Sequence, residues 1–341
     1  WHTALVPAYL KTLYKNDKFY KKTKTVFTIH NLAYQGDFPK STFAKTLLPL
    51  ELEQEMTHNG KINFMKTGLL YADAITAVSA KYAEEIRANE EYGCWLQEIL
   101  EKRKRHLFGI TNGIDREKWN PATDEIIPHK YEFKSIDAKI ENKKALLAKM
   151  KLPFSEKIPL IGIISRLADQ KGFDLICEIL DDVMKMDVQF VLLGVGEKKY
   201  HILFEKAARK HPNKFAVALR FDHELAHWIE AGSDMFLMPS CYEPCGLNQL
   251  YSMKYGTVPI VRATGGLTET VDQIDAAKGS GTGFKFEKYD SKELLKTVQR
   301  AVQLFANQTA WRKIQKNGMS KDFSWEVSAK KYIRLYKKLL K

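Results

Sequence analysis

The sequence has few of the residues that mark disulfide-linked or metal-bound proteins. Its 341 residues include four cysteines. Only Cys241 and Cys245 are close together, and no second Cys or His pair is present to complete a zinc site with them. Free thiols are typical of a reducing compartment. We therefore expect a cytoplasmic protein, or a plastid protein if the source is a plant, with no metal site and no disulfide framework.

Long apolar runs are also missing. The most apolar stretches, such as "IPLIGII" and "MFLM", are far shorter than the roughly 20 residues that a membrane-spanning helix needs. The first ten residues, "WHTALVPAYL", lack the basic start and the cleavage site of a signal peptide. We expect no membrane partner. Because the chain starts at Trp1 and not at a methionine, we also expect it to be a fragment of a longer polypeptide.

Arginine is scarce although the chain is basic. The formal net charge is +13, but only eleven of the 54 basic residues are Arg, which binds phosphate in a bidentate manner better than Lys does. The lysines are scattered in stretches such as "KKTK", "EKRKR" and "KKYIRLYKKLLK", and none of these carries a nucleic-acid-binding signature. A solvated lysine-rich surface explains this pattern best. We expect no nucleic-acid partner, which leaves small anionic substrates.

The second part of the chain alternates between strands and helices. From Pro159 on, apolar runs rich in β-branched residues predict strands at 159–165, 189–196, 215–221, 234–240 and 257–263. Amphipathic stretches between them predict helices at 173–186, 200–210, 224–231 and 247–255. Strands that are apolar throughout and separated by helices indicate a parallel sheet covered on both faces. This is the pattern of a doubly wound α/β domain, which binds ligands at the carboxyl ends of its strands.

The first part of the chain resembles half of such a unit. "KTVFTIHN" and "HLFGITNGID" predict strands, and residues 63–88 predict a helix, a strand and a helix. Residues 117–157 have weaker patterning and are predicted to be a surface excursion that leads into a helix. The chain length suits two domains. We assign residues 1–106 to an incomplete first domain, completed by a final helix at 324–341, and residues 107–323 to the second domain.

The loop after the first strand of the second domain, "SRLADQKG", carries Arg166 and Lys171. Together they could hold a diphosphate without a metal, the Arg by its fork and the Lys as a point charge. Ordinary surface ion pairs explain this loop equally well when it is considered alone. The loop after the next strand, "VGEKKY", lacks the third glycine of a dinucleotide-binding motif and is explained equally well as a tight turn.

Two further loops place glycines at predicted helix starts. In "CYEPCGLNQ" we expect Gly246 to open a helix whose free N–H groups could bind an anion or a sugar hydroxyl. Glu243 lies just before it and could bind hydroxyls, although a helix-capping acid is the simpler explanation. Gly265 and Gly266 in "TGGLTETV" predict a second such helix start. Because these loops follow successive strands, we expect them on one edge of the sheet.

Several long motifs resemble bacterial glycogen synthase and plant starch synthase, the ADP-glucose-type glucan synthases of glycosyltransferase family five. In chain order they are "WHTALVPAYL", "TIHNLAYQG", "NFMKTGLLYADAITAVS", "ITNGID", "GIISRLADQKGFDL", "AGSDMFLMPSCYEPCGLNQLYSMKYGTVPIVRATGGLTETV" and "GTGF". The resemblance runs from Trp1 to the final helix. It implies the GT-B fold, with two Rossmann-like domains, a cleft between them and a last helix that crosses back to the first domain.

The resemblance also implies an activity and site residues. The family transfers glucose from ADP-glucose to the non-reducing end of an α-1,4-glucan such as glycogen or starch, with retention of configuration and without a cofactor. His2 matches a residue that contacts the donor sugar, and Arg166 and Lys171 match the pair that stabilises the leaving diphosphate. Glu243 matches the acid that binds the transferred glucose. Further substrate-binding matches are Asn112, Cys245, Gly246, Leu247, Gly265, Gly266, Leu267 and Thr268. His30 and Asn31 match a family segment at the wall of the cleft.

The sequence departs from the family or from its wider relatives in three places. Tyr251 stands where broader retaining transferases place a second Glu, as it does in this family, so a two-carboxylate glycosidase mechanism gains no support. Cys241 stands where the family usually has Arg. The family's K-x-G-G-L loop, which helps to bind the nucleotide, would precede Trp1. We therefore expect that residues 1–341 alone do not elongate glycogen.

Two other functions remain open at this point. One is a different retaining GT-B transferase, of the sucrose- or trehalose-synthesising type, which product analysis would distinguish. The other is a non-catalytic fragment that binds a glucan or a nucleotide. The residues alone also leave open the donor base (ADP or UDP), the acceptor length, the oligomeric state and the regulation.

Overall fold

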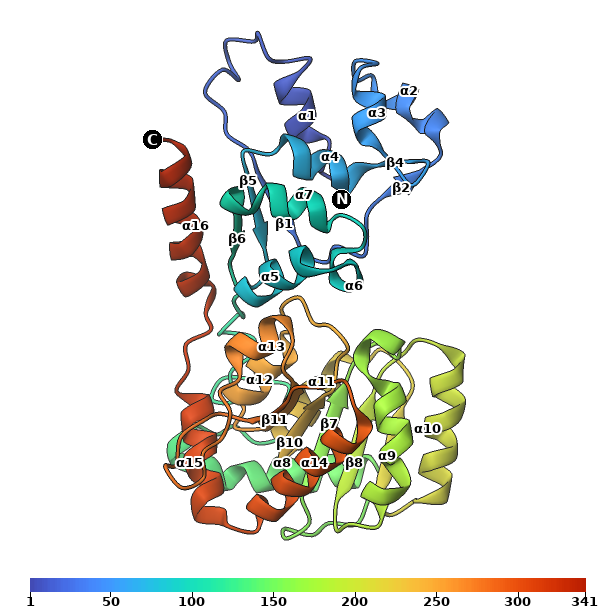
Figure 1. The fold of residues 1–341 in the computed structure, drawn as a ribbon. Coiled ribbons are helices and arrows are strands. Elements are labelled where there is room, and N and C mark those ends of the chain that lie inside the picture. Colours follow the sequence, from blue (N-terminus) through green and yellow to red (C-terminus); the bar gives the residue numbers. More distant parts are fainter. The chain divides into compact units, whose positions relative to one another are not determined.

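The computed structural model describes all 341 residues and divides into two compact units (Figure 1). The first unit comprises Trp1–Asn112 with Glu326–Lys341, and the second comprises Gly113–Trp325. These limits differ by a few residues from those we expected. Strand β6 (Leu107–Gly109), which we had assigned to the second domain, pairs in parallel with β5 (Ala74–Ala77) of the first unit. Strand pairing, which the sequence does not reveal, decides the unit to which this strand belongs.

The second unit contains a six-stranded sheet in the order β12-β11-β10-β7-β8-β9, and every neighbouring pair is parallel. The strands are β7 (Leu160–Ile164), β8 (Gln189–Leu193), β9 (Phe215–Ala218), β10 (Met235–Met238), β11 (Val258–Arg262) and β12 (Phe284–Phe286). Strands β8 and β9 follow β7 on one side of the sheet, and β10, β11 and β12 then follow on the other side. The strand order therefore reverses between β7 and β10, which is where doubly wound sheets bind ligands. The predicted doubly wound architecture is confirmed for this unit.

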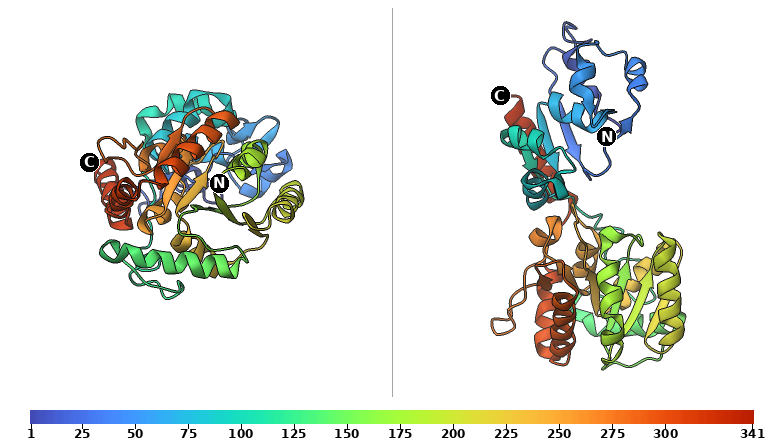
Figure 2. Two further views of the ribbon diagram at one scale, coloured as in Figure 1. Left: turned by 90° about the horizontal axis from the view of Figure 1, so that it is seen from below. Right: turned by 45° about the vertical axis from the view of Figure 1, so that its right-hand side comes forward.

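Helices cover both faces of this sheet (Figure 2). They are α8 (Lys139–Lys149), α9 (Phe173–Met184), α10 (Lys198–Lys210), α11 (His223–Gly232), α12 (Asn248–Lys254), α13 (Gly265–Thr270), α14 (Ser291–Phe305) and α15 (Gln308–Met319). One core packs α9, α10, α14 and α15 against the sheet, and a second packs α8 and α11 against its other face. No helix in the chain has both the length and the hydropathy that crossing a membrane requires.

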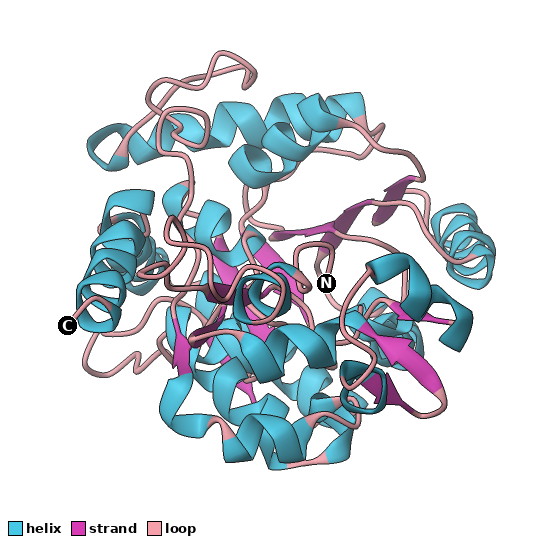
Figure 3. Cartoon of the chain, turned by 90° about the horizontal axis from the view of Figure 1, so that it is seen from above, coloured by secondary structure: helices cyan, strands magenta, loops and turns pink.

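The first unit contains a three-stranded parallel sheet, β1-β5-β6, in which β1 (Val26–Ile29) is an edge strand. Helices α4 (Phe64–Tyr71) and α5 (Ala80–Ala88) flank β5 in the chain, as predicted for this segment. Figure 3 shows the helices and strands by type. The remaining helices of this unit are α1 (Val6–Lys11), α2 (Phe43–Thr46), α3 (Leu52–Met56), α6 (Glu90–Gly93) and α7 (Gln97–Lys102).

The last helix, α16 (Trp325–Leu339), packs on the first unit. Its Leu335 is buried in a cluster with Ala74 and Ile110, and the Ser328 hydroxyl donates a hydrogen bond to the Thr111 carbonyl oxygen at 2.6 Å. The chain therefore returns to its first unit, as the family resemblance implied.

Two features of the fold differ from the sequence-based expectation. A small antiparallel sheet, β2-β4-β3, was not predicted; its strands are Asp37–Phe38, Lys61–Asn63 and Thr57–His58. The segment 117–157 is also more than a surface excursion, because Asp124 and Tyr131 are 4% and 3% exposed. The Tyr131 hydroxyl donates to the Tyr255 carbonyl oxygen at 2.7 Å. This stretch buries polar and aromatic side chains without an apolar period, so patterning did not reveal its burial.

Candidate active site

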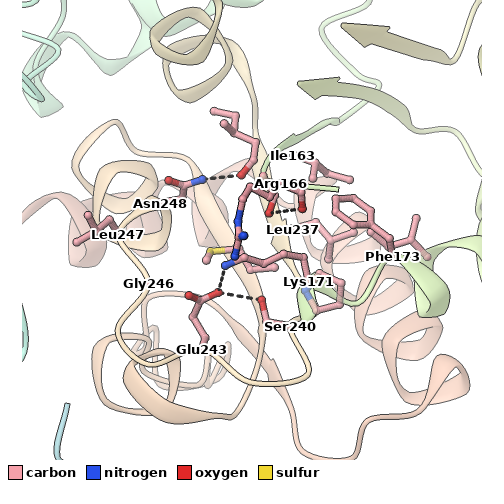
Figure 4. A pocket seen from close by; sticks show the side chains of 15 residues that line it. Ile163, Arg166, Lys171, Phe173, Leu237, Ser240, Glu243, Gly246, Leu247 and Asn248 are labelled. Atoms are coloured by element: carbon pink, nitrogen blue, oxygen red, sulfur yellow. Dashed lines mark hydrogen bonds and ion pairs between the residues drawn. The ribbon is translucent and has the colours of Figure 1, made fainter. Parts of the chain in front are cut away.

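A pocket of about 230 Å³ lies at the carboxyl ends of β7 and β10, where the strand order of the second unit reverses (Figure 4). Its lining brings together Arg166, Lys171, Glu243, Gly246 and Leu247, which the sequence had singled out. Two loops far apart in the chain supply these residues. The structure thus places a potential diphosphate-binding pair and a single carboxylate at one strand edge.

The centre of the pocket is an ion pair between Lys171 and Glu243. The Lys171 Nζ donates to the Glu243 Oε2 at 2.7 Å, and the Ser240 hydroxyl donates to the same oxygen at 3.0 Å (Figure 4). The two charged side chains are 19% and 8% exposed. Charges withdrawn from water to this degree need close partners. Each group therefore compensates the other until a ligand offers alternatives.

The structure corrects the predicted helix start at Gly246. Helix α12 begins two residues later, at Asn248, and no side chain caps its N-terminus. Gly246 instead adopts a left-handed conformation, with φ of 70°. Glu243 is also not a helix-capping acid, because its carboxylate bonds to Lys171 and Ser240. The glycine allows the chain to turn between Glu243 and α12.

Two glycines are required where backbones meet at this site. Gly172 has φ of 73°, and a Cβ there would lie 2.1 Å from the Pro239 carbonyl oxygen. Gly265 has φ of 44°, and a Cβ there would lie 2.0 Å from the Glu243 carbonyl oxygen. A side chain at Gly172 would push the Lys171 loop away from the Glu243 loop, and one at Gly265 would push the start of α13 away from it. The close approach at Gly172 keeps Lys171 within reach of Glu243.

The Gly265–Thr268 turn is used differently from the anion seat that we expected. The Gly266 N–H donates to the Glu243 carbonyl oxygen at 3.0 Å and the Leu267 N–H donates to that of Thr264, so neither is available to a ligand. The Leu267 side chain lies in the hydrophobic core. The Thr268 hydroxyl oxygen is buried without a hydrogen-bond partner. The turn therefore supports the loop of Glu243. Cys245, also predicted to bind substrate, is 6% exposed.

A second pocket of about 370 Å³ adjoins the first and is mainly apolar. The two pockets share Arg166 and Asn248, together with the end of β7. Phe221 and Val195 line the second pocket and are 87% and 40% exposed. Sequence reasoning missed this pocket. An aromatic residue that shortly follows a strand at the carboxyl edge, as Phe221 follows β9, was a usable signal.

Trp119 forms part of the wall of this second pocket and was also missed. Its ring is stacked between those of His227 and Tyr251, with centroids 3.9 Å away on each side. Behind it, the His227 Nδ1 lies 2.7 Å from the Asp124 Oδ2, which also accepts a hydrogen bond from the Tyr255 hydroxyl. Burial alone would raise the pKa of Asp124, but these hydrogen bonds hold it below its usual value. A buried polar network therefore fixes Trp119.

The other predicted site residues belong to the first unit. His2 is exposed and stacks on Trp1 with ring centroids 3.8 Å apart. His30 and Asn31 directly follow β1, and the Asn31 side-chain oxygen accepts a hydrogen bond from the Ala33 N–H. Asn112 is half-buried at the end of the first stretch of this unit. His30, Asn31 and Asn112 lie just beyond the carboxyl ends of strands in the sheet of this unit, and His2 lies near the N-terminus of the chain.

Glu230 lines the second pocket and leads to a prediction on pH and stability. It is fully buried, and burial raises its pKa to about 8, although a hydrogen bond from Ser252 opposes this effect. The folded protein therefore retains a proton that the unfolded chain loses above its ordinary pKa of 4.5. It follows that the contribution of Glu230 to the free energy of unfolding falls as the pH rises from 4.5 to 8.

Glu230→Gln removes this titration. We expect the variant and the parent to unfold similarly in urea at pH 5, and the variant to be more stable at pH 9 by on the order of 3–5 kcal/mol. A stability difference that is the same at both pH values would show that Glu230 is not protonated in the folded protein.

No group of three or more His, Cys, Asp or Glu side chains that could hold a metal ion occurs in the chain. The positive charge available to a ligand in the two pockets comes from basic side chains, chiefly Arg166 and Lys171.

Comparisons with known proteins place this arrangement in a family. Residues 1–102 match the starch synthase catalytic domain, and residues 147–318 match the family of glycosyl transferases group 1. The chain is 48% identical to a glycogen synthase of Koribacter versatilis and 49% identical to one of Thermosipho africanus. These alignments cover 99% and 100% of this chain and 70% of each relative.

Solved structures agree with the sequence relatives. The catalytic domain of starch synthase IV from Arabidopsis thaliana, bound to ADP and acarbose, superposes with a TM-score of 0.92 at 34% identity, over 100% of this chain and 71% of that one. Sucrose-phosphate synthase from Thermosynechococcus elongatus, at 20% identity, superposes with a TM-score of 0.58 over 92% and 67% of the two chains, which shows a shared GT-B fold alone. On this sequence identity and coverage, the chain belongs to the glycogen synthase and starch synthase family of glucan-synthesising hexosyltransferases.

Proposed function

We propose that the second unit binds ADP-glucose and that the enzyme transfers its glucose to the non-reducing end of an α-1,4-glucan, with retention of configuration. The observation that carries this proposal is the pair of adjoining pockets that share Arg166. One contains a Lys–Glu pair, and the other is mainly apolar with exposed aromatic surface.

The pockets match the parts of a nucleotide sugar in order. A sugar, a diphosphate and a nucleoside follow one another in the ligand. Glu243 suits the sugar hydroxyls, Arg166 and Lys171 suit the diphosphate, and the exposed ring of Phe221 suits a flat base. Arg166 lines both pockets and thus lies where the diphosphate would connect the two ends. Starch synthase IV, to which the chain is similar, was solved with ADP, which supports adenine as the base.

The chemistry follows from where charge develops. As the bond between glucose C1 and the diphosphate oxygen breaks, negative charge grows on the diphosphate. Positive groups already oriented toward it stabilise the transition state more than the ground state. Arg166 offers a planar fork and Lys171 a point charge with three donors. Lys171 can therefore approach the diphosphate while it retains one hydrogen bond to Glu243.

The acceptor completes the reaction. Its terminal sugar hydroxyl attacks C1 from the face that the diphosphate leaves, which retains the configuration. The new C1–oxygen bond forms as the bond to the diphosphate breaks, and the hydroxyl proton passes to the departing phosphate oxygen. As the family resemblance implies, we assign His2 to the donor sugar, Asn112 to the donor-binding residues, and His30 and Asn31 to the wall of the substrate cleft.

Calorimetric titration with ADP tests the binding site. We expect Arg166→Ala to weaken ADP binding by about 1.5–3 kcal/mol, because a charge-assisted bidentate contact is lost. Lys171→Ala should weaken it less, because a point charge is lost and not a bidentate contact. Arg209→Ala is a matched control, because Arg209 is exposed, pairs with Glu205 within α10 and lines neither pocket. Unchanged ADP affinity in both site variants would refute the assignment of the diphosphate site.

A further inference from the structure

Gln170 connects the two loops of the diphosphate pocket. It lies in a short 3₁₀ turn, Asp169–Lys171, between the two cations of the site. Its side-chain oxygen accepts a hydrogen bond from the Arg166 Nη2 at 3.4 Å, and its side-chain nitrogen donates one to the Tyr242 carbonyl oxygen at 3.2 Å. Tyr242 directly precedes Glu243. One amide therefore contacts a cation on one loop and the backbone next to the carboxylate on the other.

The main chain of Gln170 strengthens this connection. Its carbonyl oxygen accepts a hydrogen bond from the Cys241 N–H at 2.8 Å. The loops also touch where Gly172 approaches Pro239. Because an amide donates only through its nitrogen and accepts only through its oxygen, these two partners set the direction in which Gln170 points. The position of the Arg166 guanidinium is thereby linked to that of the Glu243 loop.

Gln170 lines neither pocket, and its side chain contacts Arg166 and the backbone next to Glu243, which do line one. We infer that Gln170 is a positioning residue that keeps Arg166 and the Glu243 loop in register while the nucleotide sugar binds. This inference rests on the proposed function and deepens it.

The ion pair in the pocket explains why such a residue is needed. In the structure, Lys171 and Glu243 hold the two loops together directly. An incoming diphosphate competes for Lys171, and sugar hydroxyls compete for Glu243. The side-chain connection between the loops weakens at the moment when accurate placement matters most, since small displacements of binding groups are costly to the reaction. The hydrogen bonds of Gln170 do not depend on the ion pair, because neither of its side-chain partners is Lys171 or the Glu243 carboxylate.

Gln170→Met tests the inference because it retains the side-chain volume and removes both hydrogen bonds. We expect ADP binding to weaken about three- to tenfold, the effect of one or two such bonds. The KM for ADP-glucose should rise while the KM for glycogen stays constant. In the Arg166→Ala background the same change should have almost no effect on ADP affinity, because the group that Gln170 orients is already missing.

A second variant and a control separate positioning from general stability. Gln170→Glu retains the acceptor for Arg166 but loses the donor to the Tyr242 carbonyl oxygen, and its negative charge competes with the diphosphate. It should weaken ADP binding more than Gln170→Met does. Gln308→Met removes a comparable hydrogen bond from an amide to a backbone carbonyl outside both pockets, and it should leave ADP affinity unchanged.

The outcomes distinguish this inference from the proposed function. If the parent protein does not bind ADP through Arg166, the proposed function fails first. If it does bind ADP in that way but Gln170→Met leaves the affinity unchanged, the positioning role is wrong. Equal weakening with and without Arg166, accompanied by a lower melting temperature, would show that Gln170 only stabilises the loop and would also overturn the inference.

Discussion

Glu243→Ala is expected to lower kcat by two to three orders of magnitude, which corresponds to about 3–4 kcal/mol of lost transition-state stabilisation. The carboxylate is 8% exposed and faces the pocket, so the change removes the only acidic side chain that lines it. The change also releases Lys171 from its ion pair. Because the freed cation can then bind the diphosphate fully, the affinity for ADP should hold or rise while turnover falls.

This opposite movement of kcat and ADP affinity separates a role in catalysis from simple damage to the site. Initial rates with ADP-glucose and glycogen, measured in the natural gene product, give kcat, and calorimetry gives the ADP affinity. Glu243→Gln is the matched control, since it retains the shape and a hydrogen-bond acceptor but not the charge, and it should be impaired less than the alanine variant. Near-normal turnover in a folded Glu243→Ala protein would remove Glu243 from the sugar site.

Gly265→Ala is expected to be the most damaging glycine substitution at the site. The new Cβ would lie 2.0 Å from the Glu243 carbonyl oxygen, and the backbone has φ of 44°. Backbone strain and overpacking each cost about 1–3 kcal/mol. We therefore expect a loss of on the order of 2–5 kcal/mol in the free energy of unfolding, or a shift of the Glu243 loop that abolishes turnover.

Gly279→Ala separates the two contributions to this loss. Gly279 also has positive φ, of 64°, but its nearest neighbour is the flexible Lys313 side chain at 3.2 Å. Urea unfolding of both variants should show the smaller loss for Gly279→Ala, with turnover retained. Equal losses in the two variants would mean that backbone strain alone accounts for the effect, and that the close approach to Glu243 contributes nothing.

The central sheet of the second unit could be predicted because its signal is strong. Strand β7 is apolar throughout, and the polar residues that follow it begin at Ser165, where the strand ends. Helix α14 has apolar side chains at Leu294, Val298, Ala301 and Phe305. This spacing would also have predicted the helix. The two- and three-residue strands of the small sheet in the first unit are too short to show any period. Only their pairing defines them.

The site residues that lie in loops directly after strands could be predicted from the sequence. Arg166, Lys171 and Glu243 lie in one pocket because their strands are neighbours in a parallel sheet. Their contacts were not predictable, because the ion pair depends on how two loops fold against each other. The aromatic wall was missed for a similar reason, since Trp119 reaches its stack from a polar segment with no regular pattern.

The most direct test of the account is the incorporation of labelled glucose from ADP-glucose into glycogen by the natural gene product, with a metal chelator present. Since Arg166 and Lys171 supply the charge for the leaving diphosphate, we predict that the chelator leaves the rate unchanged. We also predict that the added glucose is released by an enzyme specific for α-1,4 linkages, and that Arg166→Ala slows incorporation at least tenfold. A strict requirement for a divalent metal, or full incorporation by Arg166→Ala, would contradict the account.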